Sequence, residues 1–154
     1  MRGKARIMLA AASVAAVALV ISLVSVSMAS TVTKVTVIEH ATTDVVIDTD
    51  GDATDSEGDL LTFHNELFDE SNTTVVGTDQ GDCIRIEAGV SWECRWVNFL
   101  DGGSVTVEGP FFDVGPSTLA ITGGTGMYKN ASGTLKLTSN ADGTEITFAL
   151  KIIT

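Results

Sequence analysis

Polar residues stand among apolar ones at positions where the side chains of this chain should point inward. Asn65 lies on the same face of an alternating segment as Leu61, Phe63 and Leu67. A buried amide must find hydrogen-bond partners, so Asn65 either bonds to the backbone or holds a water molecule or a ligand. The sequence leaves these two roles open.

Two charged residues also occur in otherwise apolar segments. Glu39 ends a segment rich in β-branched residues. Arg85 lies two residues after Cys83 in a short, mostly apolar segment, so by alternation the two share a face. Because buried charges need partners, Glu39 and Arg85 could face each other in the interior. The alternative is that both are solvated at an open end of the fold.

The two cysteines, Cys83 and Cys94, lie eleven residues apart across a predicted hairpin that turns at Gly89. In an exported protein such a pair is typical of a disulfide, and a bonded cysteine cannot act as a free thiol. By alternation Trp92, Cys94 and Trp96 share a face, so a bond to Cys83 would place all of these side chains on one side of the hairpin.

Composition and spacing exclude several other kinds of chemistry. All 20 acidic residues and only six of the nine basic residues follow residue 30, which gives that part a formal charge of −14 and argues against nucleic acid as a partner. The acidic segment 48–59 lacks the glycine and the final glutamate of a calcium-binding EF-hand, and is interpreted as a solvated loop. No Cys/His cluster with zinc spacing and no phosphate-binding glycine motif occurs, so we expect no metal and no cofactor.

Strand signals fill the chain after residue 30, and no window has a convincing helical period. Glycine and proline turn signals separate the short alternating segments, as in β-sandwiches and β-barrels. From composition alone both architectures remain open. The predicted strands are 31–39, 45–48, 60–68, 83–88, 92–100, 105–108, 118–122, 134–139 and 144–153.

The first 29 residues have the pattern of a secretory signal peptide. Three basic residues precede a long uncharged segment, which ends in the small-residue motif Ser27-Met28-Ala29. We expect cleavage after Ala29 or Ser30, a single domain over 30–154, and a secreted, periplasmic or cell-surface location without stable membrane association. A retained membrane anchor is the alternative, because the apolar segment is long enough to span a bilayer.

Two parts of the chain resemble the allene oxide cyclase family. Residues 58–68 (GDLLTFHNELF) are similar to the family's "GDLxxFxNxLY" strand. Residues 108–112 (EGPFF) and 117–126 (STLAITGGTG) are similar to its "GP" plus aromatic and its "LA(V/I)TGG(S/T)G" motif, which dirigent proteins share in a looser form. The resemblance runs from about Val35 to Ile153.

This resemblance implies a fold and an activity. The fold is an all-β, eight-stranded antiparallel barrel of the allene oxide cyclase and dirigent type, often assembled as a homotrimer, with a pocket at one end. The expected function is binding of a hydrophobic small molecule and templating of its cyclisation, in the manner of an isomerase that orients its substrate and excludes water. A non-catalytic binding barrel of dirigent or lipocalin style is the alternative, and a barrel filled by its own side chains is a third possibility.

The resemblance also implies site residues. Glu39 matches an acidic residue that stabilises positive charge, and Asn65 matches an asparagine that holds water; these two are the expected catalytic residues. Phe63 and Cys83 match pocket residues.

Two further residues complete the expected site, and several positions depart from the family's pattern. Phe111, in place of a pocket tyrosine, and Trp96 are expected to contact the ligand with Phe63 and Cys83. The departures are the missing hydroxyl at Phe111, Ala41 in place of a second asparagine, and Ile47-Asp48 near the position of a Ser-Pro pair.

Overall fold

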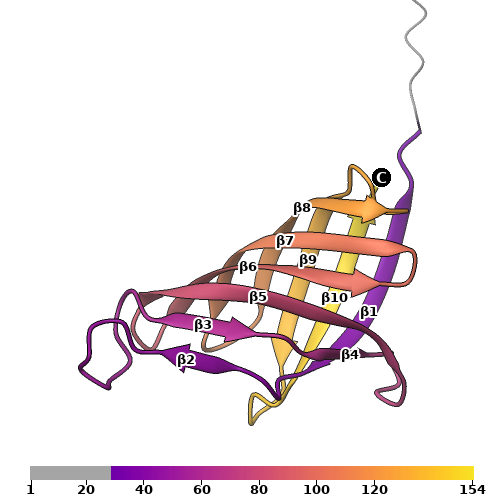
Figure 1. Cartoon of the computed structure of the whole chain (residues 1–154). Coiled ribbons are helices and arrows are strands. Elements are labelled where there is room, and N and C mark those ends of the chain that lie inside the picture. The colour runs from indigo at the N-terminus through magenta and orange to yellow at the C-terminus, as the bar shows by residue number, and fades with distance from the viewer. Residues whose placement is uncertain (1–28) are drawn as a thin grey trace, which may run out of the picture.

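The computed structural model describes residues 29–154, which form ten antiparallel strands in a closed barrel (Figure 1). Within this range no segment is helical, and so none is a long apolar helix of the kind that crosses a membrane. The signal peptide expected at residues 1–29 lies, apart from its last residue, outside the described residues. The strands are β1 (Val32–His40), β2 (Val45–Ile47), β3 (Leu60–Phe63), β4 (Glu66–Phe68), β5 (Val75–Glu87), β6 (Ser91–Leu100), β7 (Gly103–Phe112), β8 (Ser117–Gly126), β9 (Ser132–Ser139) and β10 (Glu145–Ile153).

The ring is closed by pairing at every neighbouring position. β1 pairs with β10, and β10, β9, β8, β7, β6 and β5 then follow one another around the wall. β5 pairs with β3 and β4, and β4 returns to β1. β1 and β2 together occupy one position of the wall, and β3 and β4 together occupy the next, so the ten strands form eight positions. The predicted all-β, eight-stranded antiparallel barrel is confirmed, and the sandwich is not formed.

Alternation along the strands places apolar side chains in the barrel interior, as expected for a pleated wall. Along β6, Trp92, Cys94 and Trp96 are buried while their neighbours face outward, which confirms the predicted shared face. The ring of Trp96 packs against Phe148 of β10 and contacts the edge of Phe63 from β3, so aromatic side chains occupy the middle of the lumen.

Between β1–β2 and β3–β4 the backbone ladder is interrupted. Residues 41–44 separate β1 from β2, and residues 64–65 separate β3 from β4, so the predicted strand 60–68 is split in two. Side chains replace the missing backbone bonds: the Thr43 hydroxyl accepts the backbone N–H of His64 at 2.8 Å, and Asn65 Oδ1 accepts the N–H groups of Thr42 and Thr43 at 3.0 Å each. We call this part of the wall the stitched segment.

β5 begins eight residues before the segment 83–88 that the sequence predicts. Its first half carries Gly77 and Gly81, which are typical of turns, yet both lie within the strand. A Cβ atom at Gly77 would clash with the carbonyl oxygen of Phe99, and one at Gly81 would clash with Cβ of Trp96. These glycines therefore allow β5 to approach β6 closely.

Candidate functional site

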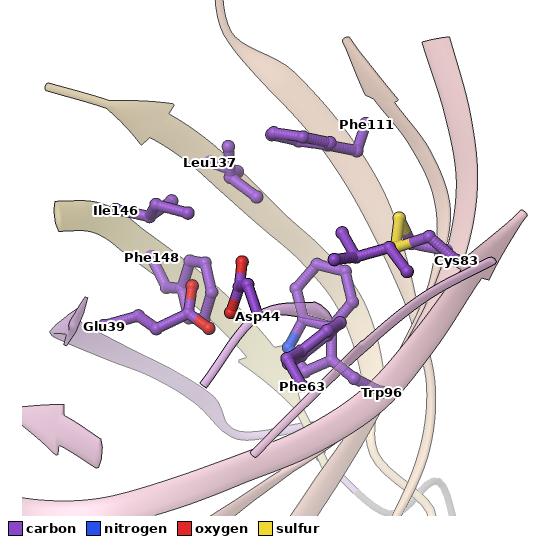
Figure 2. Close-up of a pocket in the computed structure, with 11 residues that line it drawn as sticks. Glu39, Asp44, Phe63, Cys83, Trp96, Phe111, Leu137, Ile146 and Phe148 are labelled. Carbon is purple, nitrogen blue, oxygen red and sulfur yellow. A yellow bond between two sulfur atoms is a disulfide. The ribbon is translucent and has the colours of Figure 1, made fainter. Parts of the chain in front are cut away.

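One end of the lumen holds a small cavity of about 50 Å³ (Figure 2). Its walls are mostly apolar and aromatic, and two acidic side chains contribute the polar atoms. A cavity of this size holds a few water molecules or part of a ligand, since roughly 150 Å³ encloses a benzene molecule. The lining residues are Glu39, Asp44, Leu61, Phe63, Cys83, Cys94, Trp96, Phe111, Leu137, Ile146 and Phe148.

The Asn65 side chain holds both acidic side chains of the cavity in place. Its Nδ2 donates to Glu39 Oε1 at 2.8 Å and to Asp44 Oδ1 at 2.7 Å. Its Oδ1 accepts the backbone N–H groups of Thr42 and Thr43 and lies 3.0 Å from the Thr43 hydroxyl. All hydrogen-bonding groups of the amide are thus used within the protein. Asn65, 1% exposed, lies behind the two carboxyls and does not line the cavity.

Glu39 projects from β1 into the lumen and is only 4% exposed. Burial raises the pKa of its carboxyl well above the ordinary value, and the negative charges of Asp79 and Asp44 raise it further, against the opposing effect of the Asn65 hydrogen bond. Asp79 of β5 is fully buried beside it, and burial raises the pKa of Asp79 to about 7. This end of the barrel therefore retains a carboxyl proton near neutral pH.

The two cysteines are joined by a disulfide that forms part of the cavity wall. Cys83 of β5 lies directly opposite Cys94 of β6, and their sulfur atoms are bonded. Both side chains line the cavity, so Cys83 presents a disulfide there and no thiol.

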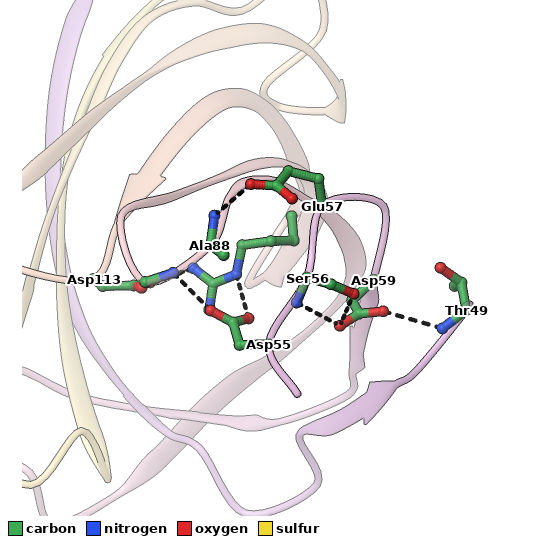
Figure 3. A network of polar contacts seen from close by, with 9 residues as sticks. Thr49, Asp55, Ser56, Glu57, Asp59, Ala88 and Asp113 are labelled. Atoms are coloured by element: carbon green, nitrogen blue, oxygen red, sulfur yellow. Dashed lines mark hydrogen bonds and ion pairs between the residues drawn. The ribbon is translucent and has the colours of Figure 1, made fainter. Parts of the chain in front are cut away.

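Arg85 does not meet Glu39, so the pairing that the sequence left open is not formed. Its guanidinium donates to Asp55 at 2.7 Å and to both oxygens of Asp113 at 2.7 and 2.8 Å, and Figure 3 labels these two partners. The guanidinium also lies 3.9 Å from the ring centre of Trp92. The partners come from loops that the sequence does not place near β5, which is why the pairing could not be predicted.

The acidic segment 48–59 is tied to the barrel rather than merely solvated. Asp55, as well as pairing with Arg85, accepts the N–H of Gly89. Asp59 is 1% exposed and accepts the N–H groups of Thr49 and Ser56 (Figure 3). No group of three or more metal-ligating side chains is found between residues 29 and 154.

The structure brings together five of the six residues predicted for the site. Glu39, Phe63, Cys83, Trp96 and Phe111 all line the cavity. Only Asn65 stands behind it.

Sequence reasoning missed the two acids that complete this cluster. By alternation Asp79 shares a face with Gly81 and Cys83, and this pattern could have predicted that it points inward. The flanking residues Gly77 and Gly81, however, are typical of a turn. Asp44 follows the end of β1, and nothing in its local pattern predicts that it lines a cavity.

The arrangement can donate a proton inside a largely apolar cavity. A buried acid that keeps its proton near neutral pH is suited to general acid catalysis. The aromatic walls suit an apolar ligand and hold it near that proton. Asp44, exposed at the edge of the same cavity, offers a second carboxyl that can accept a proton.

Solved structures with the same barrel are found among enzymes and dirigent proteins. A pyocyanin demethylase is 27% identical, with a TM-score of 0.67 over 78% of this chain and 99% of that chain. A pterocarpan synthase dirigent protein is 18% identical, with a TM-score of 0.66 over 82% and 87%. The Diels-Alderase AbmU from Streptomyces koyangensis is 15% identical, with a TM-score of 0.64 over 80% of this chain and 63% of that chain. At 18% and 15% identity, the last two similarities show a shared fold and no more.

The sequence itself matches a family model. The model described as allene oxide cyclase matches residues 30–153, which is nearly the whole of the described chain. The matched range contains every strand of the barrel and every residue that lines the cavity. The chain therefore belongs to the allene oxide cyclase family.

Proposed function

We propose that this barrel is an isomerase that cyclises or rearranges a hydrophobic small molecule by proton transfer from Glu39. The observation that carries the proposal is the position of Glu39: a carboxyl in the wall of an aromatic cavity, whose burial raises its pKa well above the ordinary value. General acid catalysis of this kind contributes typically about 10²- to 10⁴-fold to a rate.

Four residues that line the cavity, and Asn65 behind them, have a role in this proposal. Glu39 donates its proton to an oxygen or carbon atom of the bound molecule. The Asn65 amide then stabilises the new carboxylate through the hydrogen bond that it already makes to Oε1. Asp44 removes a proton from another atom of the same molecule, so that the overall change is an isomerisation. Phe63 and Trp96 orient the molecule and exclude water.

The size of the cavity limits the substrate. About 50 Å³ does not hold an extended fatty chain. We therefore propose that the reacting end of the molecule enters beside Glu39 while the rest lies at the mouth, near Phe111. The names of the similar structures support a reaction on a small organic molecule, since they refer to a demethylase of pyocyanin, a pterocarpan synthase and a Diels-Alderase.

The proposal is tested with two probes and a matched pair of variants. One probe is cyclohex-3-enone, a small apolar ketone whose acid-catalysed isomerisation to the conjugated enone is followed by ultraviolet absorbance. The other is an allene oxide generated in situ from a fatty-acid hydroperoxide, with chiral analysis of the cyclopentenone. Glu39→Gln removes the proposed acid, and Glu66→Gln, an exposed glutamate on β4, serves as control.

We expect the wild type and Glu66→Gln to accelerate at least one reaction, or to give an enantiomeric excess, and Glu39→Gln to lose the effect by about 10²-fold or more. Full activity in Glu39→Gln would contradict the assignment of the acid. Products identical to the protein-free controls for both probes would contradict the isomerase.

A non-catalytic binding barrel is the second candidate, and one observation favours it. Asn65 is saturated by protein groups and so has no donor or acceptor left for a water molecule or a ligand. Native mass spectrometry of the protein from its own host distinguishes the two: a retained hydrophobic ligand together with no acceleration of either probe favours the binding barrel. The same spectra test the proposed homotrimer.

We also propose that the protein is secreted. The disulfide of the barrel supports this, because such bonds persist in oxidising compartments. N-terminal sequencing of the mature protein should begin at Ser30 or Thr31. An N-terminus at Met1 in a membrane fraction would instead show a retained anchor.

A further inference from the structure

Asp79 carries the one buried side-chain oxygen or nitrogen atom that lacks a hydrogen-bond partner in residues 29–154. The residue is fully buried on β5, where its backbone exchanges two hydrogen bonds with Asn65. Its Oδ1 also accepts the backbone N–H of Asn65 at 3.2 Å. Its Oδ2 has no donor. An unpaired buried carboxylate oxygen is costly, so its surroundings must supply what is missing.

The polar groups around this oxygen come from three segments. Glu39 faces it from β1, the Asn65 amide lies between β3 and β4, and Asp44 comes from the loop after β1. None of these is a cation, and the four ion pairs between residues 29 and 154 all lie elsewhere. The Asn65 amide already donates to Glu39 and Asp44. Among the protein groups, the remaining source of a donor is a proton on one of the two buried carboxyls.

We propose that Asp79 is a positioning residue that shares the Glu39 proton and holds the Glu39 carboxyl in its acid form. Oε1 of Glu39 accepts the Asn65 amide, so the proton resides on Oε2 and is donated to Asp79 Oδ2. Two carboxyls that share one proton form a charge-assisted hydrogen bond, and neither oxygen is then left unpaired. The contact fixes the protonation state of Glu39 in the resting barrel.

The consequence for catalysis rests on the proposed function of Glu39. For the reaction the Oε2–H group of Glu39 turns from Asp79 toward the substrate. When this O–H bond breaks, the proton goes to the substrate and the electron pair remains on Glu39, beside the negative charge of Asp79. The repulsion makes Glu39 a strong proton acceptor, so the proton that Asp44 removes from another atom of the substrate can pass to Glu39, and the acid is restored without an external donor. Asp79 thus adapts Glu39 to reversible proton transfer near neutral pH.

The pairing can be tested without any substrate, by carboxyl ¹³C NMR titration of the full barrel. In the wild type we expect one glutamate resonance, assigned by its absence in Glu39→Gln, to remain protonated at pH 7. In Asp79→Asn the midpoint of that resonance should fall by at least one pH unit, because the facing charge is gone and the new amide donates to Glu39. Asp82→Asn, at a half-exposed aspartate on the same strand, should leave it unchanged.

An ordinary midpoint for Glu39 in the wild type, or the same raised midpoint in Asp79→Asn, would overturn the pairing. The wild-type titration alone decides this if Asp79→Asn does not fold. Failure of the proposed function is a separate result: Glu39→Gln would then retain activity while the raised titration of Glu39 persists in the wild type. If the pairing and the proposed function are both correct, the alkaline limb of the pH–rate profile should lie at lower pH in Asp79→Asn than in the wild type.

Discussion

Replacing Asp79 by asparagine should stabilise the barrel, and increasingly so as the pH rises. The raised pKa of Asp79 means that the folded protein binds a proton that the unfolded chain has already released. Between its ordinary pKa of 3.8 and its folded value of about 7, the free energy of unfolding of the wild type must therefore fall with pH. Asparagine has nearly the same shape, carries no charge, and removes this cost.

The magnitude follows from the size of the shift. Each pKa unit corresponds to about 1.4 kcal/mol, so a shift from 3.8 to about 7 amounts to about 4 kcal/mol at pH 7. At pH 4 the difference should be under about 1 kcal/mol, because the aspartate in the unfolded chain is then itself about half protonated. The Oδ1 bond to the Asn65 backbone can be kept by the amide oxygen of the variant.

Urea unfolding at pH 4 to 8 measures this, with the fluorescence of the buried residues Trp92 and Trp96 as the signal. Asp82→Asn is the matched control; its side chain is 42% exposed and its removal should change stability by less than about 0.5 kcal/mol at every pH. A loss of stability in Asp79→Asn of the same size at pH 4 and pH 8 would refute the reasoning, because it would show a structural role for the carboxylate independent of its protonation.

Three further variants test the wall of the barrel. Replacing Cys83 and Cys94 by alanine removes a cross-link of sequence separation 11, and should lower the free energy of unfolding by about 3 kcal/mol in the chain-entropy model; an unchanged urea midpoint would contradict this. Arg85→Gln should lower the free energy of unfolding by about 2 kcal/mol, because hydrogen bonds to charged groups contribute roughly 1.5 to 3 kcal/mol. A urea midpoint equal to that of the wild type would mean that the two ion pairs of Arg85 are fully screened. Gly81→Ala places a methyl group against Trp96 of the neighbouring strand and should cost at least about 1 to 3 kcal/mol in urea unfolding, whereas an unaltered midpoint would show that β5 can move away from β6.

The elements that the sequence predicts well are those whose pattern is local. In β6 the alternation of Trp92, Cys94 and Trp96 with charged neighbours fixes which side chains are buried, and in 60–68 the same reasoning places Phe63 and Asn65 correctly. The direction of a side chain follows from pleating alone once a strand is recognised. The barrel was then separable from the sandwich only by the family resemblance.

The elements that escape prediction depend on contacts between distant segments. The start of β5 at Val75 contains glycines that make sense only beside the backbone of β6. For that reason Asp79 could not be recognised as a strand residue that faces inward. Arg85 pairs with loops far away in sequence, and a charged side chain carries no local sign of its partner. The acid cluster combines these difficulties, because β1, β5 and two loop segments all contribute to it.

The stitched segment ties ligand entry to the chemistry of the barrel. Elsewhere backbone ladders join the neighbouring strands, with register shifts in three of them, but here a threonine hydroxyl and the Asn65 amide replace the ladder. A guest larger than the cavity requires the ring to widen, and widening begins where the fewest main-chain bonds must part. Widening at this point would break the hydrogen bonds of the Asn65 amide, which also orients Glu39 and Asp44. If the barrel binds a guest as proposed, the Asn65 side chain would govern both the entry of the guest and the orientation of the acid.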